Sequence, residues 1–211
     1  MLPEPSPPRW RERASSENVG MPLLVLLNGG PASGKSTLAH LWAQERPLAL
    51  SLLDVLRAMI ADWERHPVEA GLRTRDLALT MIGDHLAHER DVIVPQFLAN
   101  TTFIDQLQKA AMTSGAQFVE VVLLETPEIA ERRVRDRAAR AERSGSPNVV
   151  HGSLGTESMQ EVVQRHREFI DSREQIVRVT PVDGDVDASL DRLRRAIDAR
   201  VRSADRCRPA D

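Results

Sequence analysis

The chain has 211 residues, a length that suits a single domain with a substantial core. Its net charge of −3 excludes the broad positive field that is typical of nucleic-acid-binding domains. A single cysteine, Cys207, excludes an internal disulfide and fits a reducing cytoplasm, and no apolar run approaches the roughly 18 residues of a membrane span.

The two ends of the chain differ in composition from the segment between them. Residues 1–20 have four prolines in the first eight positions and no apolar core, so we expect a disordered leader. Residues 203–211 are mostly polar, and we expect them to form a flexible tail. This leaves residues 21–202 as one folded domain.

The first predicted strand, Leu23–Leu27, runs into a glycine-rich loop and then into a predicted helix, Lys35–Glu45. The loop sequence GGPASGKS satisfies the pattern G-x-x-x-x-G-K-[ST] of a phosphate-binding loop, or Walker A motif. The backbone N–H groups of such a loop and the positive end of the helix dipole bind phosphate oxygens. The predicted nucleotide-binding residues are Gly29, Gly30, Pro31, Ala32, Ser33, Gly34, Lys35, Ser36 and Thr37.

The loop also carries side chains that suit a triphosphate. Only two of the 28 Lys and Arg residues are lysines, and one of them, Lys35, stands where a compact ammonium suits a phosphate site. We expect Lys35 to reach the β- and γ-phosphates and the Ser36 hydroxyl to bind a metal ion. The predicted cofactors are therefore ATP and Mg²⁺.

Short apolar runs alternate with amphipathic segments along the rest of the chain. The further predicted strands are 48–52, 92–97, 118–124 and 176–180. The further predicted helices are 55–64, 72–89, 102–113, 127–143, 157–172 and 187–202. This alternation predicts an α/β fold in which helices cover both faces of a parallel sheet, the three-layer arrangement of a P-loop protein.

Asp54 follows the second predicted strand, at the edge of the sheet where ligands of open α/β folds bind. Its carboxylate could accept the proton of an attacking hydroxyl or hold Mg²⁺ through a water; capping the next helix is the alternative role. Arg57 lies three residues later, and we expect it to orient a polar or acidic substrate. Arg73, Arg75 and Asp76, in the next predicted helix, are further candidates for lining the acceptor pocket.

The third predicted strand ends without an acid. Many P-loop proteins carry a metal-binding Asp there, whereas this chain has Pro95 and Gln96. Metal binding must then rely on Ser36, on Asp54 through a water, and on the phosphates themselves. Gln96 could hydrogen-bond the substrate from the same edge; the alternative is a purely structural polar residue.

The segment 131–156 has the composition of a lid. Its helical part is nearly all Arg, Glu, Asp and Ala and runs into a Gly/Ser-rich connection, so it can bury little. Arg133 and Arg137 are four residues apart and share one helix face. The planar guanidinium of Arg133 could stack on adenine, and that of its neighbour Arg137 could steady the transferring phosphoryl group. The alternative is a solvated helix beside a disordered loop.

Three features together resemble the small P-loop kinases: the strand–GGPASGKST–helix unit, Asp54 with Arg57 behind it, and the RVRDR sequence at 133–137. This group includes gluconate, shikimate and adenylate kinases, chloramphenicol phosphotransferase, and the zeta-toxin and polynucleotide-kinase-like proteins. Bacterial AAA family ATPases are also similar, since their third strand ends in V-P-Q. The resemblance covers about residues 21–201. It implies a five-stranded parallel sheet in the order 2-3-1-4-5, an Asp54 that binds or activates the acceptor hydroxyl, and lid arginines (Arg133, Arg137) that contact adenine and phosphates.

The leading hypothesis is an ATP-dependent phosphotransferase acting on a hydroxyl of a small molecule, with an antibiotic or another secondary metabolite as a candidate acceptor. One alternative is an ATP-binding sensor without transfer chemistry. The other is a kinase of nucleotides or nucleic-acid ends. The negative net charge, the scarcity of stacking residues (four Phe, three Trp and no Tyr) and an apolar Leu52, where some relatives carry an Asp, argue against it. We expect no membrane partner, and the sequence specifies neither the acceptor nor the oligomeric state.

Overall fold

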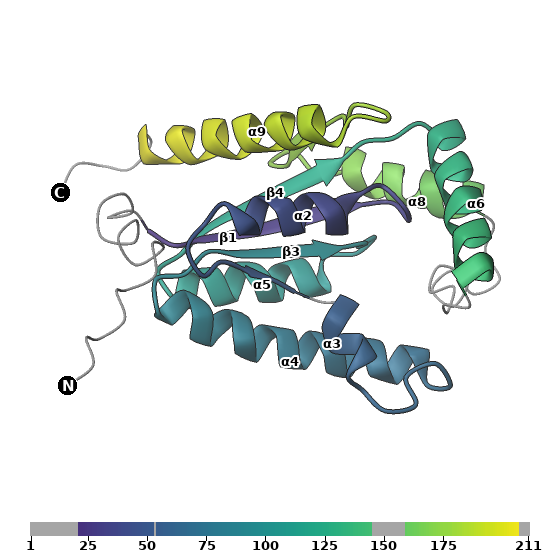
Figure 1. Cartoon of the computed structure of the whole chain (residues 1–211). Coiled ribbons are helices and arrows are strands. Elements are labelled where there is room, and N and C mark those ends of the chain that lie inside the picture. Colours follow the sequence, from purple (N-terminus) through teal and green to yellow (C-terminus); the bar gives the residue numbers. More distant parts are fainter. Residues whose placement is uncertain (1–20, 53, 145–158, 207–211) are drawn as a thin grey trace, which may run out of the picture.

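The structure is a computed structural model that describes residues 21–52, 54–144 and 159–206. Its centre is a five-stranded parallel sheet in the order β2-β3-β1-β4-β5 (Figure 1). The strands are β1 (Leu23–Gly29), β2 (Leu50–Ser51), β3 (Val92–Gln96), β4 (Gln117–Leu123) and β5 (Val177–Val179). The α/β class, the parallel pairing and the strand order are confirmed.

Helices cover both faces of the sheet, as expected (Figure 1). The helices within the described residues are α2 (Lys35–Gln44), α3 (Asp54–Ala58), α4 (Pro67–Ala87), α5 (Thr102–Thr113), α6 (Pro127–Ser144), α8 (Met159–Asp171) and α9 (Val186–Arg206). Of these, α6 stands beyond the ends of the strands (Figure 1). No helix in the part of the chain that the structure describes is both long and apolar enough to cross a membrane.

The side chains of β1 show how the core forms on both faces. Leu23, Val25 and Leu27 belong to one buried cluster with residues of α2 and α9. Leu24 and Leu26 belong to a second cluster with residues of α4 and α5. Because successive strand residues point to opposite faces, a continuously apolar strand fits only a sheet that is covered on both sides.

Two helix boundaries differ from the prediction. The helix predicted at 55–64 ends at Ala58, and the helix predicted to start at Leu72 starts at Pro67. After Ala58 the chain turns more tightly, because the N–H groups of Met59 and Ile60 donate to carbonyl oxygens three residues earlier. The left-handed Asp62 (φ 58°) then prevents the helix from resuming. Pro67 has no N–H to donate and a fixed φ, so it suits the first position of the second helix. At the other end, α9 runs to Arg206, beyond the expected end at 202.

The strand register brings the ends of three strands together. Asn28 lies opposite Gln96 of β3, and Gly29 lies opposite Leu123 of β4. The segments that follow β1, β3 and β4 therefore leave the same edge of the sheet side by side. A candidate site at this edge can combine residues from widely separated parts of the sequence.

Candidate functional site

The phosphate-binding loop begins at the end of β1. Its shape depends on a close contact at Gly29 and on the left-handed backbone of two later residues. A Cβ atom at Gly29 would lie 2.7 Å from Ser33 Oγ and 3.2 Å from Leu123 Cβ, so a larger residue would force the loop apart. Ala32 (φ 60°) and Gly34 (φ 83°) are left-handed just before α2 begins at Lys35. The loop therefore curls tightly between the strand and the first turn of the helix.

Lys35 lies over this loop. Its Nζ donates a hydrogen bond to the carbonyl oxygen of Gly30 at 3.0 Å, so the ammonium folds back across the curled backbone. Ser33 is almost fully buried, and its Oγ has no hydrogen-bond partner within the described residues. Ser36 and Thr37 are exposed in the first turn of α2. A curled loop, an ammonium above it and a helix N-terminus together fit the phosphates of a nucleotide.

Asn28 is a fully buried polar residue next to this loop. Its Nδ2 donates to the Leu98 carbonyl oxygen at 3.0 Å, and the Leu98 N–H donates to its Oδ1 at 3.0 Å. These two bonds fix the orientation of the amide. Oδ1 also accepts from the N–H of Gly29 at 2.8 Å. The side chain thus ties the first residue of the phosphate loop to the segment after β3.

His166, on α8, completes this buried network. Its Nε2 lies 3.1 Å from Asn28 Oδ1, and because that oxygen is an acceptor, Nε2 carries the proton and donates. The imidazole also packs on Phe97, with the ring centroids 5.0 Å apart. Burial, and secondly the charge of Lys35, lower the pKa of His166 to about 4. A neutral imidazole therefore anchors α8 to the phosphate loop.

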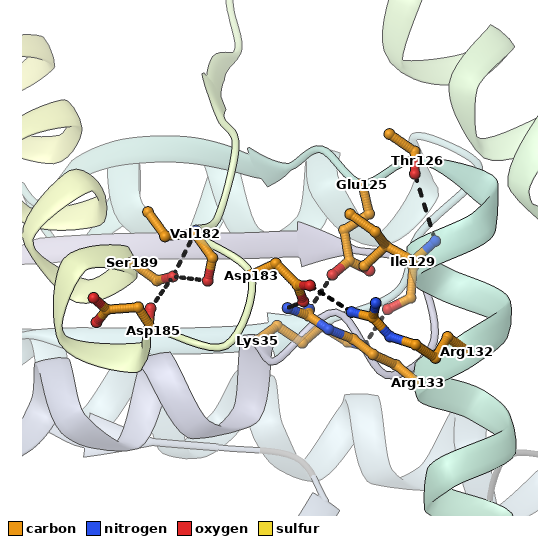
Figure 2. Close-up of polar contacts among 11 residues, drawn as sticks. Lys35, Glu125, Thr126, Ile129, Arg132, Arg133, Val182, Asp183, Asp185 and Ser189 are labelled. Atoms are coloured by element: carbon orange, nitrogen blue, oxygen red, sulfur yellow. Dashed lines mark hydrogen bonds and ion pairs between the residues drawn. The ribbon is translucent and has the colours of Figure 1, made fainter.

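A second network lies beside Lys35. Arg133 Nη1 forms an ion pair with Glu125 Oε1, and Arg133 Nη2 lies 3.2 Å from Asp183 Oδ1. Figure 2 shows Glu125, Arg133 and Asp183 pointing toward one another beside Lys35. Burial raises the pKa of Glu125, while the charges of Arg133 and then Lys35 oppose that shift. Three elements, the end of β4, α6 and the loop after β5, therefore meet at one arginine.

The loop that carries Asp183 is itself held in place. The Val182 N–H donates to Ser189 Oγ at 2.8 Å (Figure 2). The Ala188 N–H donates to Asp185 Oδ1 at 2.9 Å, which caps α9. These bonds fix the chain on the α9 side of Asp183. The carboxylate that faces Arg133 therefore lies on a braced turn.

The structure separates the two predicted lid arginines. Arg133 is half-buried in the network just described, whereas Arg137 is exposed one turn further along α6. Arg132, which precedes them, also forms an ion pair with Asp183; this carboxylate raises the pKa of Arg132. Residues 145–156 of the predicted lid lie outside the described residues.

The residues predicted to contact the acceptor lie near the ends of β2 and β3. Asp54 is the first residue of α3, and its side chain lies outside the described part of the chain. Arg57 lies against α4, because a Cβ atom on Gly71 would be 3.5 Å from its Nη2. Gln96 is half-buried at the end of β3, opposite Asn28. The backbone thus brings all three positions to the edge that carries the phosphate loop.

Four residues of the two networks were not predicted as site residues. Asn28 follows an apolar run and Glu125 follows a predicted strand, just as Asp54 does, so the position of each directly after a strand could have marked it as a site residue. No such local pattern marks His166 or Asp183. They meet partners 138 and 50 positions away in the sequence, and only the folded chain brings these residues together.

A family model described as an AAA domain matches residues 24–154, which is more than half of the chain. A search of the curated proteins found no match. Among solved structures, the chain is similar to a gluconokinase from Sinorhizobium meliloti 1021, with a TM-score of 0.53 and 19% identity. That alignment covers 88% of this chain and 95% of the gluconokinase.

Two further solved structures show the same likeness. The tunicamycin resistance protein of Deinococcus radiodurans has a TM-score of 0.52 and 17% identity, over 83% of this chain and 95% of that one. A shikimate kinase from Aquifex aeolicus vf5 has a TM-score of 0.53 and 14% identity, over 84% of this chain and 98% of the other. At these identities the likeness shows that the fold is that of the P-loop kinases.

Proposed function

This chain belongs to the AAA domain family, and on that premise we propose that it transfers the γ-phosphate of ATP to a hydroxyl group of a small molecule. The observation that carries the proposal is the curled phosphate loop with Lys35 folded back onto the Gly30 carbonyl. Asp54 begins the helix that follows β2, at the same edge of the sheet. Neighbours in the same fold that are named as a gluconokinase and a shikimate kinase support phosphotransfer.

ATP and Mg²⁺ are the cofactors of the proposed reaction. The backbone N–H groups of residues 29–37 would bind the β- and γ-phosphates, and Lys35 would donate to them from above the loop. The Ser36 hydroxyl, and Asp54 through a water, are the groups that would hold Mg²⁺, which neutralises phosphate charge when bound. An exposed hydroxyl in the first turn of α2 fits this ion, because Mg²⁺ in kinases takes few protein ligands besides phosphate oxygens and waters.

On the acceptor side, Asp54 is the proposed general base. Its carboxylate would accept the proton of the acceptor hydroxyl as the oxygen attacks the γ-phosphorus, while Arg57 and Gln96 bind the acceptor. Phosphoryl transfer depends chiefly on positioning and charge neutralisation, which gives the arginines of α6 a role. Arg137 would steady the transferring group, and Arg133, oriented by Glu125 and Asp183, would contact the adenine side of the nucleotide.

An antibiotic or another secondary metabolite is a candidate acceptor, and the likeness to the tunicamycin resistance protein supports it. A cytoplasmic setting is part of the proposal, because the reaction uses ATP and the chain has a single cysteine. Neither a membrane nor a nucleic acid is required as a partner.

A transfer assay tests the proposal. The protein is incubated with Mg·ATP and a panel of hydroxylated metabolites and antibiotics, and mass spectrometry should find an acceptor that gains one phosphoryl group. Lys35→Ala should abolish this gain. Lys109→Ala should leave it unchanged, because Lys109, the other lysine of the chain, is exposed on α5.

One outcome would favour a sensor instead. If the protein binds Mg·ATP through Lys35 but no acceptor gains a phosphoryl group, transfer is excluded and nucleotide binding remains. The structure offers such a sensor a means of response, because Arg133 connects α6 to the end of β4 and to the loop after β5. Nucleotide-dependent protection of α6 in hydrogen exchange would then be the expected signal.

A further inference from the structure

Two arginines meet at the acceptor edge of the sheet. Arg57 lies in the last turn of α3, and its Nη2 is 3.5 Å from where a Cβ atom on Gly71 of α4 would be. Arg75 follows Gly71 by one turn on the same face of α4. Its guanidinium carbon lies 5.4 Å from the centroid of the Phe103 ring, in the first turn of α5. The two cations therefore lie along one face of α4, Arg57 reaching it from α3 and Arg75 contacting the start of α5.

Neither of these guanidinium groups has a carboxylate within 4.0 Å among the residues that the structure describes. Arg73 differs: it lies two residues earlier on α4, is exposed, and has Asp76 at 3.9 Å. An exposed arginine without a partner is ordinary, because water solvates it. Arg75, however, is half-buried.

The surroundings of Arg75 disfavour its charge. Burial lowers the pKa of Arg75, and the positive charge of Arg57 lowers it further. Two like charges, one of them partly withdrawn from water, raise the free energy of the folded protein. Contact with the Phe103 face offsets only part of this cost. A bound anion would neutralise both cations at once.

The pair lies on the acceptor side of the proposed reaction. Arg57 is three residues beyond Asp54 on α3, and Phe103 belongs to the helix that follows β3 and Gln96. β3 is hydrogen-bonded to β1, which ends in the phosphate loop. An acceptor held by the two arginines is therefore close to the edge where the γ-phosphate would be presented.

We propose that the acceptor is an anion: a hydroxylated molecule whose carboxylate or phosphate ester binds Arg57 and Arg75 while its hydroxyl group faces Asp54. This inference rests on the proposed transferase function and narrows its substrate class. Planar guanidinium groups present paired N–H donors that match two oxygens of a carboxylate or phosphate. The charge of the acceptor, more than its size, then selects it.

Matched acceptor pairs test the role of charge. Transfer from Mg·ATP is measured with gluconate against glucose, shikimate against its methyl ester, and glycerol 3-phosphate against glycerol. The first two pairs vary a carboxylate and the third varies a phosphate ester, so they identify which oxyanion is accepted. We expect transfer only to anionic members of these pairs. Equal or faster transfer to a neutral member would overturn the inference.

Variants test whether the two arginines are responsible. Arg75→Gln should raise the KM of an anionic acceptor about ten- to hundred-fold, the usual effect of losing a hydrogen bond to a charged group, and leave the KM of ATP unchanged. Arg195→Gln is the matched control, because it removes an exposed arginine from α9, on the face of the sheet opposite to α4. Both KM values should remain at their wild-type levels in that control.

A binding measurement makes the test independent of turnover. The phosphate loop is first saturated with a non-hydrolysable ATP analogue, and inorganic sulfate is then titrated as an oxyanion probe while the melting temperature is followed. Arg57→Gln and Arg75→Gln should need about tenfold more sulfate than wild type or Arg195→Gln for the same shift in melting temperature. Equal shifts in all four proteins would contradict the proposal. If Arg75→Gln fails to fold, Arg57→Gln, on the short helix α3, decides the result.

Failure of the inference and failure of the proposed function give different results. If no acceptor gains a phosphoryl group, the transferase function fails, and the sulfate titration still decides whether Arg57 and Arg75 form an anion site. If a neutral acceptor is phosphorylated in a reaction that requires Lys35, the transferase function stands and the anionic acceptor is excluded.

Discussion

The proposed nucleotide side and the proposed acceptor side of this sheet edge differ in how their arginines are paired. Beyond β4 and β5, Arg133 is held between two carboxylates, Glu125 and Asp183. Beyond β2 and β3, Arg57 and Arg75 lie near each other with no carboxylate partner among the described residues, although Arg75 is half-buried. The protein's own ion pairs therefore orient the arginine of the proposed nucleotide side, whereas the proposed acceptor side keeps positive charge that a bound anion would balance.

Because of this contrast, we expect substitutions on the two sides to affect different properties of the protein. On the proposed nucleotide side, changes should disturb the folded state or the orientation of the side chains before any ligand binds, because the side chains there hold the loop and one another. On the acceptor side, changes should reduce turnover with little loss of stability, because the groups there interact mainly with substrate. Each of the following predictions challenges one half of this division.

The largest expected effect is on the acceptor side. Asp54→Asn should lower kcat by about 10²–10⁴, because an amide cannot accept the proton of the attacking hydroxyl. The melting temperature should remain at its wild-type value, and the affinity for Mg·ATP should fall only slightly, because Asp54 would hold Mg²⁺ through a water and not directly. Single-turnover kinetics and calorimetry measure the two properties separately. Asp62→Asn is the control, since Asp62 is exposed in the turn after α3 and asparagine tolerates its left-handed backbone. A full transfer rate in Asp54→Asn would remove the general base from the mechanism.

On the nucleotide side, the next effect is a dependence of stability on pH. The pKa of His166 is lowered by burial to about 4 in the folded protein, against 6.5 for an ordinary histidine. Between these values the unfolded chain binds a proton that the folded protein does not. The free energy of unfolding should therefore fall as the pH is lowered from 7 to 4, by about 3 kcal/mol from this residue at about 1.4 kcal/mol per pH unit.

Urea unfolding at several pH values between 7 and 4 measures this contribution. His166→Phe keeps an aromatic ring against Phe97 but cannot be protonated, so its stability should fall less steeply with acid than that of the wild type. His88→Asn, at an exposed position on the far end of α4, should keep the wild-type slope. Parallel slopes for wild type and His166→Phe would mean that the imidazole does not remain neutral when folded.

A smaller effect is expected at the start of the phosphate loop. Gly29→Ala places a methyl group 2.7 Å from Ser33 Oγ and should destabilise the protein by about 1–3 kcal/mol, the range for overpacking a dense site. Adding Ser33→Ala removes that oxygen and should restore part of the loss, which a double-mutant cycle on unfolding free energies would detect. Gly30→Ala has no atom within 4 Å of the new methyl group and should be nearly neutral. Additive effects of the first two substitutions would contradict the packing argument.

The sequence predicts well what depends on local pattern. The GGPASGKS motif predicts the phosphate loop. The apolar runs predict the strands, because a buried parallel strand needs a continuous apolar segment. The strand order follows from the family resemblance. The sequence overestimates the length of the helix α3. The tight turns after Ala58 and the left-handed backbone of Asp62 have no apolar pattern that would reveal them.

The buried hydrogen bond between Asn28 and His166 could not be predicted from local sequence patterns. His166 reads as one more residue on the apolar face of a helix, and its partner, Asn28, is 138 positions away. Only the packing of α8 on the ends of β1 and β3 turns that histidine into a hydrogen-bond donor to the phosphate loop. Glu125 was within reach, because the rule that singled out Asp54 after β2 applies equally to an acid after β4.

The smallest predicted effect concerns the two carboxylates that hold Arg133. Glu125→Gln leaves Asp183 at 3.2 Å from Arg133 Nη2, and Asp183→Asn leaves the ion pair with Glu125, so each single variant should change the Mg·ATP affinity only slightly. The double variant frees the guanidinium and should weaken Mg·ATP binding roughly tenfold, more than the product of the single effects, as expected for residues that share a partner. Calorimetry on the four proteins gives the coupling. If the double variant shows only the product of the single effects, Arg133 is not held jointly, and the nucleotide side is less preorganised than its ion pairs indicate.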